Sequence, residues 1–283
     1  MRLMRFGDRG SETPAVQVDG TTYDATSVTD DFHPEFFAGG GLDKLRAAVA
    51  DGNLPELDTT GKRIGAPLAR PQALICIGQN YAAHAAESGS EPPKQPIIFF
   101  KHPNTLRGPN DDVRIPKGAE KVDWEVELAV VIGAEARYLS SPEEAATCIA
   151  GYAISNDVSE RRFQSEISGG QWSKGKCAED FQPFGPWVAV DEIDDPQKLN
   201  LKSSVNGEER QNSNTADMIF SVAALIQDLS QFMVLSPGDV VNTGTPQGVA
   251  LSGRFPFLKE GDTMELEIDG LGTQSQKLIA YDA

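Results

Sequence analysis

Acidic residues alternate with apolar ones in the stretch KVDWEVELAVVIG, which spans residues 121–133. Successive side chains of a β-strand point to opposite faces, so Glu125 and Glu127 would share a face about 7 Å apart. Two carboxylates that close repel each other unless a cation lies between them, and Mg²⁺ is commonly held by a few carboxylates. The commoner origin of alternating acids is a solvent-exposed face, but the following residues, 128–132, are apolar on both faces. The pattern therefore allows two interpretations, a metal site at the entrance to a covered sheet or a solvated strand.

A third acid could complete such a site. Asp157 ends the otherwise apolar segment YAISNDVS, which alternates as a strand does. With Glu125 and Glu127 it would give an all-oxygen set that suits a hard divalent cation, whereas no group of His or Cys residues points to zinc or copper. The alternative is that Asn156 and Asp157 only supply turn chemistry.

The elements that must position these acids lie in residues 69–283, which we expect to form one catalytic domain. Short strands are predicted at 73–78, at 97–100, from residue 121 onward and at 152–159, with a hairpin turning at Asn206-Gly207 and strands near the C-terminus. Helices are predicted at 80–88, 140–151, 159–168 and 218–233, and a long loop at 169–186. Because strands outnumber helices and many connections are too short for a parallel crossover, we expect a mainly β, α+β architecture.

Residues 1–68 are predicted to form a separate small α/β domain. Asp19-Gly20 is a favoured hairpin turn between two alternating segments. The segment 42–52 has the periodicity of an amphipathic helix closed by a glycine, and the polar run 55–67 is a plausible linker.

Composition excludes several classes of partner. The chain has 283 residues and a net charge of −17, so it offers no basic field for nucleic acid or for an anionic membrane surface. No segment is apolar for long enough to cross a bilayer, and the N-terminus has no signal-peptide pattern. Three widely spaced cysteines, an odd number, indicate reduced thiols. We therefore expect a cytoplasmic protein.

Several of these segments together resemble the fumarylacetoacetate hydrolase family. ICIGQNYAAHAAE, DWEVELAVVIG, YAISNDVSERRFQ, GGQWSKGK and LSPGDVVNTGTPQGV occur in the order seen in that family, and the likeness covers residues from about 70 to 283. It is greatest to the branch of 2,4-diketo-3-deoxy-sugar-acid hydrolases, acylpyruvases and 2-hydroxyhepta-2,4-diene-1,7-dioate isomerases. The resemblance implies a β-roll catalytic domain, a Mg²⁺ or Mn²⁺ cofactor and a homodimer.

The resemblance also assigns roles to individual positions. The family's metal ligands fall on Glu125, Glu127 and Asp157, its His/Glu pair on His84 and Glu87, its lysine on Lys176, and its substrate contacts on Arg161, Gln164 and Thr245. Gln79 departs from the hydrophobic or arginine residue that many relatives carry before Asn80-Tyr81.

His84, Glu87 and Lys176 each allow a catalytic interpretation and a structural one. His84 and Glu87 are three residues apart and share a helix face, so the carboxylate could orient the imidazole as a general base for water; otherwise they are a surface pair. Lys176 could stabilise an oxyanion or enolate, or be a solvated loop lysine. Cys177 beside it lacks a histidine partner that would make it a nucleophile.

The predicted substrate contacts allow the same two kinds of interpretation. Arg161 and Gln164 are also three residues apart and could grip a carboxylate, although a lone arginine there is commonly a surface charge. Thr245 in TGTP could offer its hydroxyl and neighbouring N–H groups to an anion, or belong to a structural turn.

The predicted function is a metal-dependent hydrolase that cleaves the C3–C4 bond of a 2,4-diketo acid and releases pyruvate. His84 would activate water, and the metal with Lys176 would stabilise the enolate that leaves. An oxaloacetate decarboxylase or a 2-hydroxyhepta-2,4-diene-1,7-dioate isomerase would use the same metal without cleaving a diketone, and a non-catalytic binding module is the alternative from another class.

Overall fold

A mixed nine-stranded sheet forms the centre of the computed structural model, which describes residues 1–282. In spatial order its strands are β3 (Thr21–Asp24), β2 (Thr13–Val18), β1 (Arg2–Phe6), β13 (Val188–Ala189), β10 (Ile149–Asn156), β9 (Val126–Ile132), β16 (Val240–Asn242), β4 (Leu74–Gly78) and β5 (Ile97–Lys101). All strand pairs in this sheet are antiparallel except β16 with β4. The mainly β, α+β class predicted from the sequence is confirmed.

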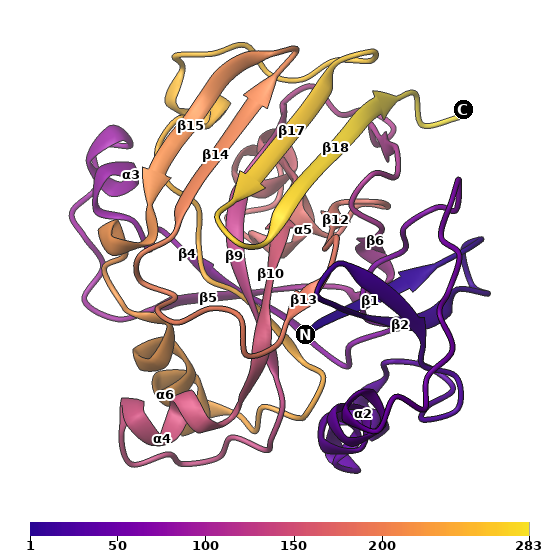
Figure 1. The fold of residues 1–283 in the computed structure, drawn as a ribbon. Coiled ribbons are helices and arrows are strands. Elements are labelled where there is room, and N and C mark those ends of the chain that lie inside the picture. Colours follow the sequence, from indigo (N-terminus) through magenta and orange to yellow (C-terminus); the bar gives the residue numbers. More distant parts are fainter. Residues whose placement is uncertain (283) are drawn as a thin grey trace.

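A second sheet lies across β9 and β10, as the orange and yellow arrows of Figure 1 show. Its order is β15 (Glu208–Asn214), β14 (Asn200–Val205), β17 (Thr263–Ile268), β18 (Gly272–Ile279) and β7 (Val113–Arg114). Two short ladders, β8 (Val122–Asp123) with β11 (Ser159–Glu160) and β6 (Leu106–Arg107) with β12 (Gln182–Pro183), are separate from both sheets. The apolar faces of the two sheets enclose the larger core, which β9 crosses with every residue buried.

The helices are short and lie around the sheets. They are α1 (Pro34–Ala38), α2 (Gly41–Ala50), α3 (Ala82–Glu87), α4 (Pro142–Thr147), α5 (Ser173–Lys176) and α6 (Val222–Phe232), with a π-helical turn η2 (Arg162–Glu166) and 3₁₀ turns η1 (Pro103–Thr105), η3 (Thr215–Asp217) and η4 (Ala250–Ser252). The cap of α4 matches its sequence signature, because the Ser141 hydroxyl accepts from the Glu144 N–H at 3.2 Å and Pro142 begins the helix. None of these helices, in the part of the chain described, is long and apolar enough to cross a membrane.

Both hairpins predicted from their turn residues are present in the structure. Asp19 and Gly20 have φ of 49° and 84°, and Asn206 and Gly207 have φ of 54° and 77°, which is the left-handed pair that a two-residue hairpin turn requires. The long loop predicted at 169–186 is wrong in two respects, because it contains the helical turn α5 and the short strand β12. Gly175 permits that turn to pack on η2, since a Cβ there would lie 2.5 Å from the Gln164 Cβ.

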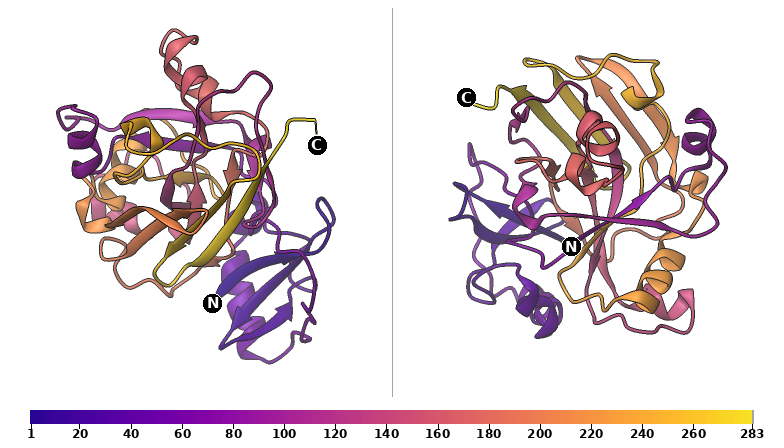
Figure 2. Two further views of the ribbon diagram at one scale, coloured as in Figure 1. Left: turned by 90° about the horizontal axis from the view of Figure 1, so that it is seen from above. Right: turned by 180° about the vertical axis from the view of Figure 1, so that it is seen from behind.

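The N-terminal residues extend the central sheet. Strand β1 pairs with β13, with Arg2 opposite Ala189 and Leu3 opposite Val188. One apolar cluster contains side chains of β1, α1 and α2 together with Val131 of β9 and Val240 of β16. Figure 2 shows these N-terminal elements, in indigo, gathered at one side of the molecule. The division into domains at residue 68 stays a prediction.

Candidate active site

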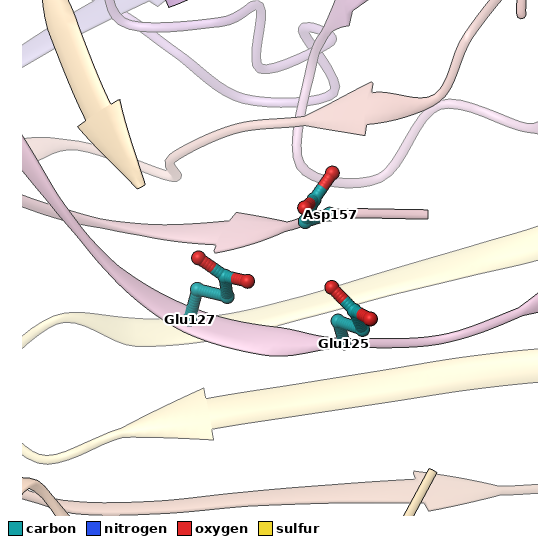
Figure 3. Close-up of side chains that lie close together, drawn as sticks. All are labelled: Glu125, Glu127 and Asp157. Atoms are coloured by element: carbon teal, nitrogen blue, oxygen red, sulfur yellow. The ribbon is translucent and has the colours of Figure 1, made fainter. Parts of the chain in front are cut away.

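The pairing of β9 with β10 brings the three predicted metal ligands together. Glu127 lies in β9 opposite Ser155, and Asp157 follows the end of β10. Glu125 lies in a break between β8 and β9, where its N–H donates to the Asn156 side-chain oxygen at 3.1 Å and its carbonyl accepts from the Asp157 N–H at 3.0 Å. The three carboxylates therefore point into one space between the strands (Figure 3).

The three side chains have the chemistry of a divalent-cation site. One carboxylate oxygen from each of Glu125, Glu127 and Asp157 lies within 4.8 Å of the others, and all three residues are buried. The solvated-face interpretation of this strand is thus wrong for Glu125 and Glu127, which are 6 % and 1 % exposed. Burial, with Asp157 and Glu125 nearby, raises the pKa of Glu127 well above its usual range. A hard cation such as Mg²⁺ or Mn²⁺ would relieve that repulsion, so this donor set fits the cofactor that the sequence predicted.

Two buried lysines partly neutralise the acids. Lys176 Nζ donates to Glu125 Oε2 at 2.6 Å and to Asp157 Oδ2 at 2.7 Å. Lys101 Nζ donates to Asp157 Oδ1 and to the carbonyl oxygens of Val158 and Phe181. Burial by itself would lower the pKa of Lys176, but the two carboxylates outweigh it and raise this pKa. Lys176 is 2 % exposed, so it is not a solvated loop lysine.

Arg161 is a third cation bound to the buried carboxylates. Its Nε donates to Asp123 Oδ2 at 2.8 Å and its Nη2 to Glu125 Oε1 at 2.7 Å. Burial would raise the pKa of Glu125, but Lys176 and Arg161 outweigh it and lower this pKa to about 2.

Acids outnumber bases in this buried cluster. The members are the carboxylates of Asp123, Glu125, Glu127 and Asp157 and the cations Lys101, Arg161 and Lys176. Four carboxylates face three cations, so one negative charge remains for a bound cation or a proton to neutralise.

His84 and Glu87 lie near each other but are not hydrogen bonded. His84 Nδ1 is 3.9 Å from Glu87 Oε2, is buried and has no hydrogen-bond partner among the described residues. Both Glu87 oxygens have other partners, the Gly248 N–H at 2.9 Å and Arg254 Nη1 at 3.0 Å. Burial lowers the pKa of His84, which favours the neutral imidazole that a general base needs. His84 is 8 % exposed, so the pair is not a surface pair.

The predicted substrate contacts are engaged within the protein. Arg161 Nη1 donates to Gln164 Oε1 at 2.9 Å, so these two side chains bind each other. The Thr245 hydroxyl donates to the Val126 carbonyl at 2.9 Å and accepts from Gln211 Nε2 at 2.8 Å. The neighbouring Gly244 N–H donates to Glu127 Oε2 at 2.8 Å. Their role as substrate contacts stays a prediction.

A cavity of about 140 Å³ lies over the carboxylates. Most of the predicted site residues line it, namely His84, Glu125, Glu127, Arg161, Gln164, Lys176 and Thr245. Asp157 and Glu87 are outside its lining; Asp157 lies behind, between the two lysines, and Glu87 faces Arg254. Gln79, which has a φ of 52°, also lines the cavity, as do Trp172 and Leu251.

Three residues with a part in this site were not predicted. Lys101 binds Asp157, and its signal is a lysine that ends the apolar strand IIFFK. Asp123 belongs to the alternating acids of the stretch 121–133, and its carboxylate accepts from Arg161 and from the N–H groups of Ala250 and Leu251. Trp172 packs edge-on against Phe99 at the cavity wall, and no local pattern distinguishes it.

Comparison with known proteins concerns the whole chain. The family model described as fumarylacetoacetate (FAA) hydrolase C-terminal matches residues 73–279. A Burkholderia ambifaria protein that carries only a general hydrolase name is 46 % identical over 281 residues, which is 98 % of each chain.

Solved structures of similar proteins cover nearly the whole chain. Fumarylacetoacetate hydrolase from Exiguobacterium antarcticum has a TM-score of 0.85 at 33 % identity, covering 99 % of both chains. A 2-hydroxyhepta-2,4-diene-1,7-dioate isomerase from Mycobacterium marinum has a TM-score of 0.77 at 30 % identity, covering 100 % of both. Maleylpyruvate hydrolase from Sphingobium sp. SYK-6, in complex with manganese (II) ion and pyruvate, has a TM-score of 0.79 at 26 % identity, covering 99 % of both.

Proposed function

Since the chain belongs to the fumarylacetoacetate hydrolase family, we propose that it is a Mg²⁺- or Mn²⁺-dependent hydrolase that cleaves the C3–C4 bond of a 2,4-diketo acid and releases pyruvate. The observation that carries the proposal is the buried carboxylate triad with one negative charge in excess, beneath a cavity that also contains His84. The manganese and pyruvate bound by the Sphingobium hydrolase support the same choice of cofactor and product. The family also supports a homodimer, which sedimentation analysis would test.

The triad residues would hold the cation. Bound by Glu125, Glu127 and Asp157, a divalent cation would act as a Lewis acid toward negative charge on the keto acid, an effect worth several kcal/mol in metalloenzymes. Lys176 fixes the positions of two of these carboxylates, since its ammonium group donates to both. Because its hydrogen bonds go to protein oxygens, Lys176 acts on the enolate through its charge and through the ligands it orients.

His84 would supply the base. In the proposed mechanism the neutral imidazole carries its proton on Nδ1, 3.9 Å from Glu87 Oε2, and Nε2 is the basic nitrogen. Nε2 takes a proton from water, and the hydroxide adds to the C4 carbonyl carbon of the substrate. The C3–C4 bond then breaks, its electron pair leaves with C3 as the pyruvate enolate, and C4 becomes the carboxyl group of the second product. Protonation at C3 completes the release of pyruvate.

Pyruvate release from a substrate panel tests this function. Protein stripped of metal on a chelating resin would be assayed on acetylpyruvate, diketo-deoxy sugar acids and oxaloacetate, with and without Mg²⁺ or Mn²⁺. We expect pyruvate and a second acid from at least one 2,4-diketo acid, only when metal is added. Turnover that persists at full rate without metal, or no pyruvate from any diketo acid, would contradict the proposal.

A second candidate uses the same residues without an attacking water. The missing hydrogen bond between His84 and Glu87, 3.9 Å apart, favours it, because isomerisation or decarboxylation needs no base oriented toward water. The isomerase from M. marinum is also similar over the whole chain. Evolution of CO₂ from oxaloacetate, or a change in ultraviolet absorbance of a hydroxydienoate without cleavage, would identify these activities.

A non-catalytic binding module would differ from the hydrolase, the isomerase and the decarboxylase in having no turnover. Such a protein would still be stabilised by Mg²⁺ with oxalate, because a ligand that binds only the folded state raises its stability. Stabilisation without turnover on any substrate would favour the binding module.

A further inference from the structure

A second and larger cavity, of about 610 Å³, lies beside the candidate active site. Its walls come from the N-terminal residues and from the segments after β5 and α5. Phe99 and Lys176 line the active-site cavity, whereas His102 and Cys177 line this one. The ends of β5 and α5 thus form a wall shared by the two cavities.

This cavity is rich in arginine, although the chain as a whole is acidic. The charged residues of its lining are Arg5, Arg9, Glu12, Arg63, Arg70, Arg107 and Glu179, with His102 beside them. Arg5, Arg63 and Arg107 pair with aspartates behind the lining, so the positive charge that the cavity presents comes from Arg9 and Arg70. A cationic concavity in such a chain concentrates anions locally.

Three of the arginines, Arg5, Arg63 and Arg107, are paired with acids of the fold. Arg5 donates to Asp31 at 2.7 and 2.8 Å and to Glu12 at 3.1 Å. Arg63 donates to Asp111 at 2.6 and 2.5 Å and to Glu12 at 3.0 Å. These guanidinium groups are committed to the structure, as is the Arg107 Nε that binds Asp180, and the unpaired positive charge is that of Arg9 and Arg70.

Arg9, Arg70 and Arg107 keep free donor capacity. Arg9 and Arg70 are exposed and have no acidic partner within salt-bridge distance among residues 1–282; Arg70 contacts only Asn104 Oδ1, at 3.3 Å. Arg107 is 6 % exposed, and its Nη2 has Glu179 no closer than 3.9 Å while its other nitrogens bind Asp180 and backbone carbonyls. Burial lowers the pKa of Arg107, and the charge of Arg9 lowers it further despite the opposing effect of Asp180.

We propose that this arginine cavity, defined by Arg9, Arg70 and Arg107, is a binding site for a small oxyanion that carries a carboxylate or phosphate group. Planar guanidinium groups bind both kinds of oxyanion through paired N–H donors. The bound anion would supply the countercharge that Arg9 and Arg70 lack, and Arg107 would provide a buried, preoriented donor at the base of the site. The site does not depend on the catalytic chemistry, because it is a different cavity.

Calorimetric titration of the whole chain with two probes tests the proposal. Inorganic phosphate and succinate represent the two oxyanions, and low ionic strength preserves charge attraction. The protein is first stripped of metal on a chelating resin, so that the candidate active site does not capture the probe. We expect one of the probes to bind at one site per chain. Binding of phosphate alone would indicate a phosphate-bearing ligand, and binding of succinate alone a carboxylate.

Matched double variants decide where the probe binds. R9Q/R70Q removes two exposed guanidinium groups and should weaken binding at least about tenfold, since each charged hydrogen bond contributes more than a neutral one. K117Q/K277Q makes the same change in net charge at exposed lysines outside the cavity and should bind as the wild type does. No binding of either probe, an unchanged dissociation constant for R9Q/R70Q, or equal weakening in both double variants would overturn the proposal.

Discussion

Replacing Glu127 by glutamine separates two effects of its negative charge, which are repulsion of the neighbouring carboxylates and binding of the metal. The substitution keeps the shape of the side chain and removes the acid whose pKa is raised by burial and by its two acidic neighbours. At 4.8 Å and an effective dielectric constant of about 20, two unit charges repel by about 3.5 kcal/mol. Lys176 offsets part of this, so we expect metal-free Glu127→Gln to be more stable than wild type by about 1–2 kcal/mol, or about 2–6 °C in Tm.

When metal is added, the wild type should become more stable than Glu127→Gln. Saturating Mg²⁺ at about 100 times its dissociation constant would stabilise the wild type by roughly 2.7 kcal/mol. The glutamine variant lacks one charged ligand and should show little of this shift. Thermal melts at pH 8 on resin-treated protein, with and without 10-fold steps of Mg²⁺ and Mn²⁺, measure both effects in one experiment.

An exposed acid provides the control for Glu127→Gln. Glu260→Gln makes the same chemical change away from the cluster and should melt and respond to metal as the wild type does. A Glu127→Gln protein that keeps the full metal-induced shift would refute the ligand assignment. One that melts below the wild type without metal would refute the excess of negative charge.

Three further changes test the surroundings of the triad. His84→Gln should lower kcat for pyruvate release by about 10²–10⁴-fold and leave metal-induced stabilisation intact, and an unchanged kcat would exclude His84 as the base. Because burial lowers the pKa of His84 from 6.5, kcat/KM of the wild type should begin to fall only below pH 6.5. Lys101→Met leaves Asp157 short of one buried cation and should lower the free energy of unfolding in urea by about 3 kcal/mol; a loss under about 0.5 kcal/mol would mean that the ion pair is not stabilising. In Glu12, burial would raise the pKa, but Arg5 and Arg63 outweigh it and lower the pKa from 4.5. The stability that Glu12 contributes is therefore present above pH 4.5 and lost as pH falls through its lower folded value. The Tm deficit of Glu12→Gln at pH 7 should therefore shrink as the pH is lowered below 4.5, and a deficit that is constant with pH would contradict the charge pairing.

Local patterns in the sequence predicted the elements well because each had a local cause. Hairpin turns at Asp19-Gly20 and Asn206-Gly207 depend on residues that accept positive φ. The helix after Ser141 depends on a hydroxyl cap. The helical turn α5 was missed because its stability comes from packing of Gly175 against η2, a tertiary contact that no local pattern reports.

The site was only partly predictable for the same reason. Alternation suggested a shared face for Glu125 and Glu127, but the register that places Asp157 beside them depends on the pairing of β9 with β10. Lys101 could not be assigned to this cluster because its partner lies 56 residues away in the chain. The predicted contact of His84 with Glu87 follows helix spacing, whereas the actual partners of Glu87 come from the distant Gly248 and Arg254.

The pairing of β1 with β13 has a practical consequence for any attempt to isolate the catalytic region. A fragment that begins at residue 69 would lose β1 and present the unpaired N–H and C=O groups of β13 to solvent. It would also uncover Val131 and Val240, which the N-terminal helices and strands now shield. Open strand edges next to bare apolar surface promote self-association, so such a truncated protein should aggregate even if its active-site residues remain intact.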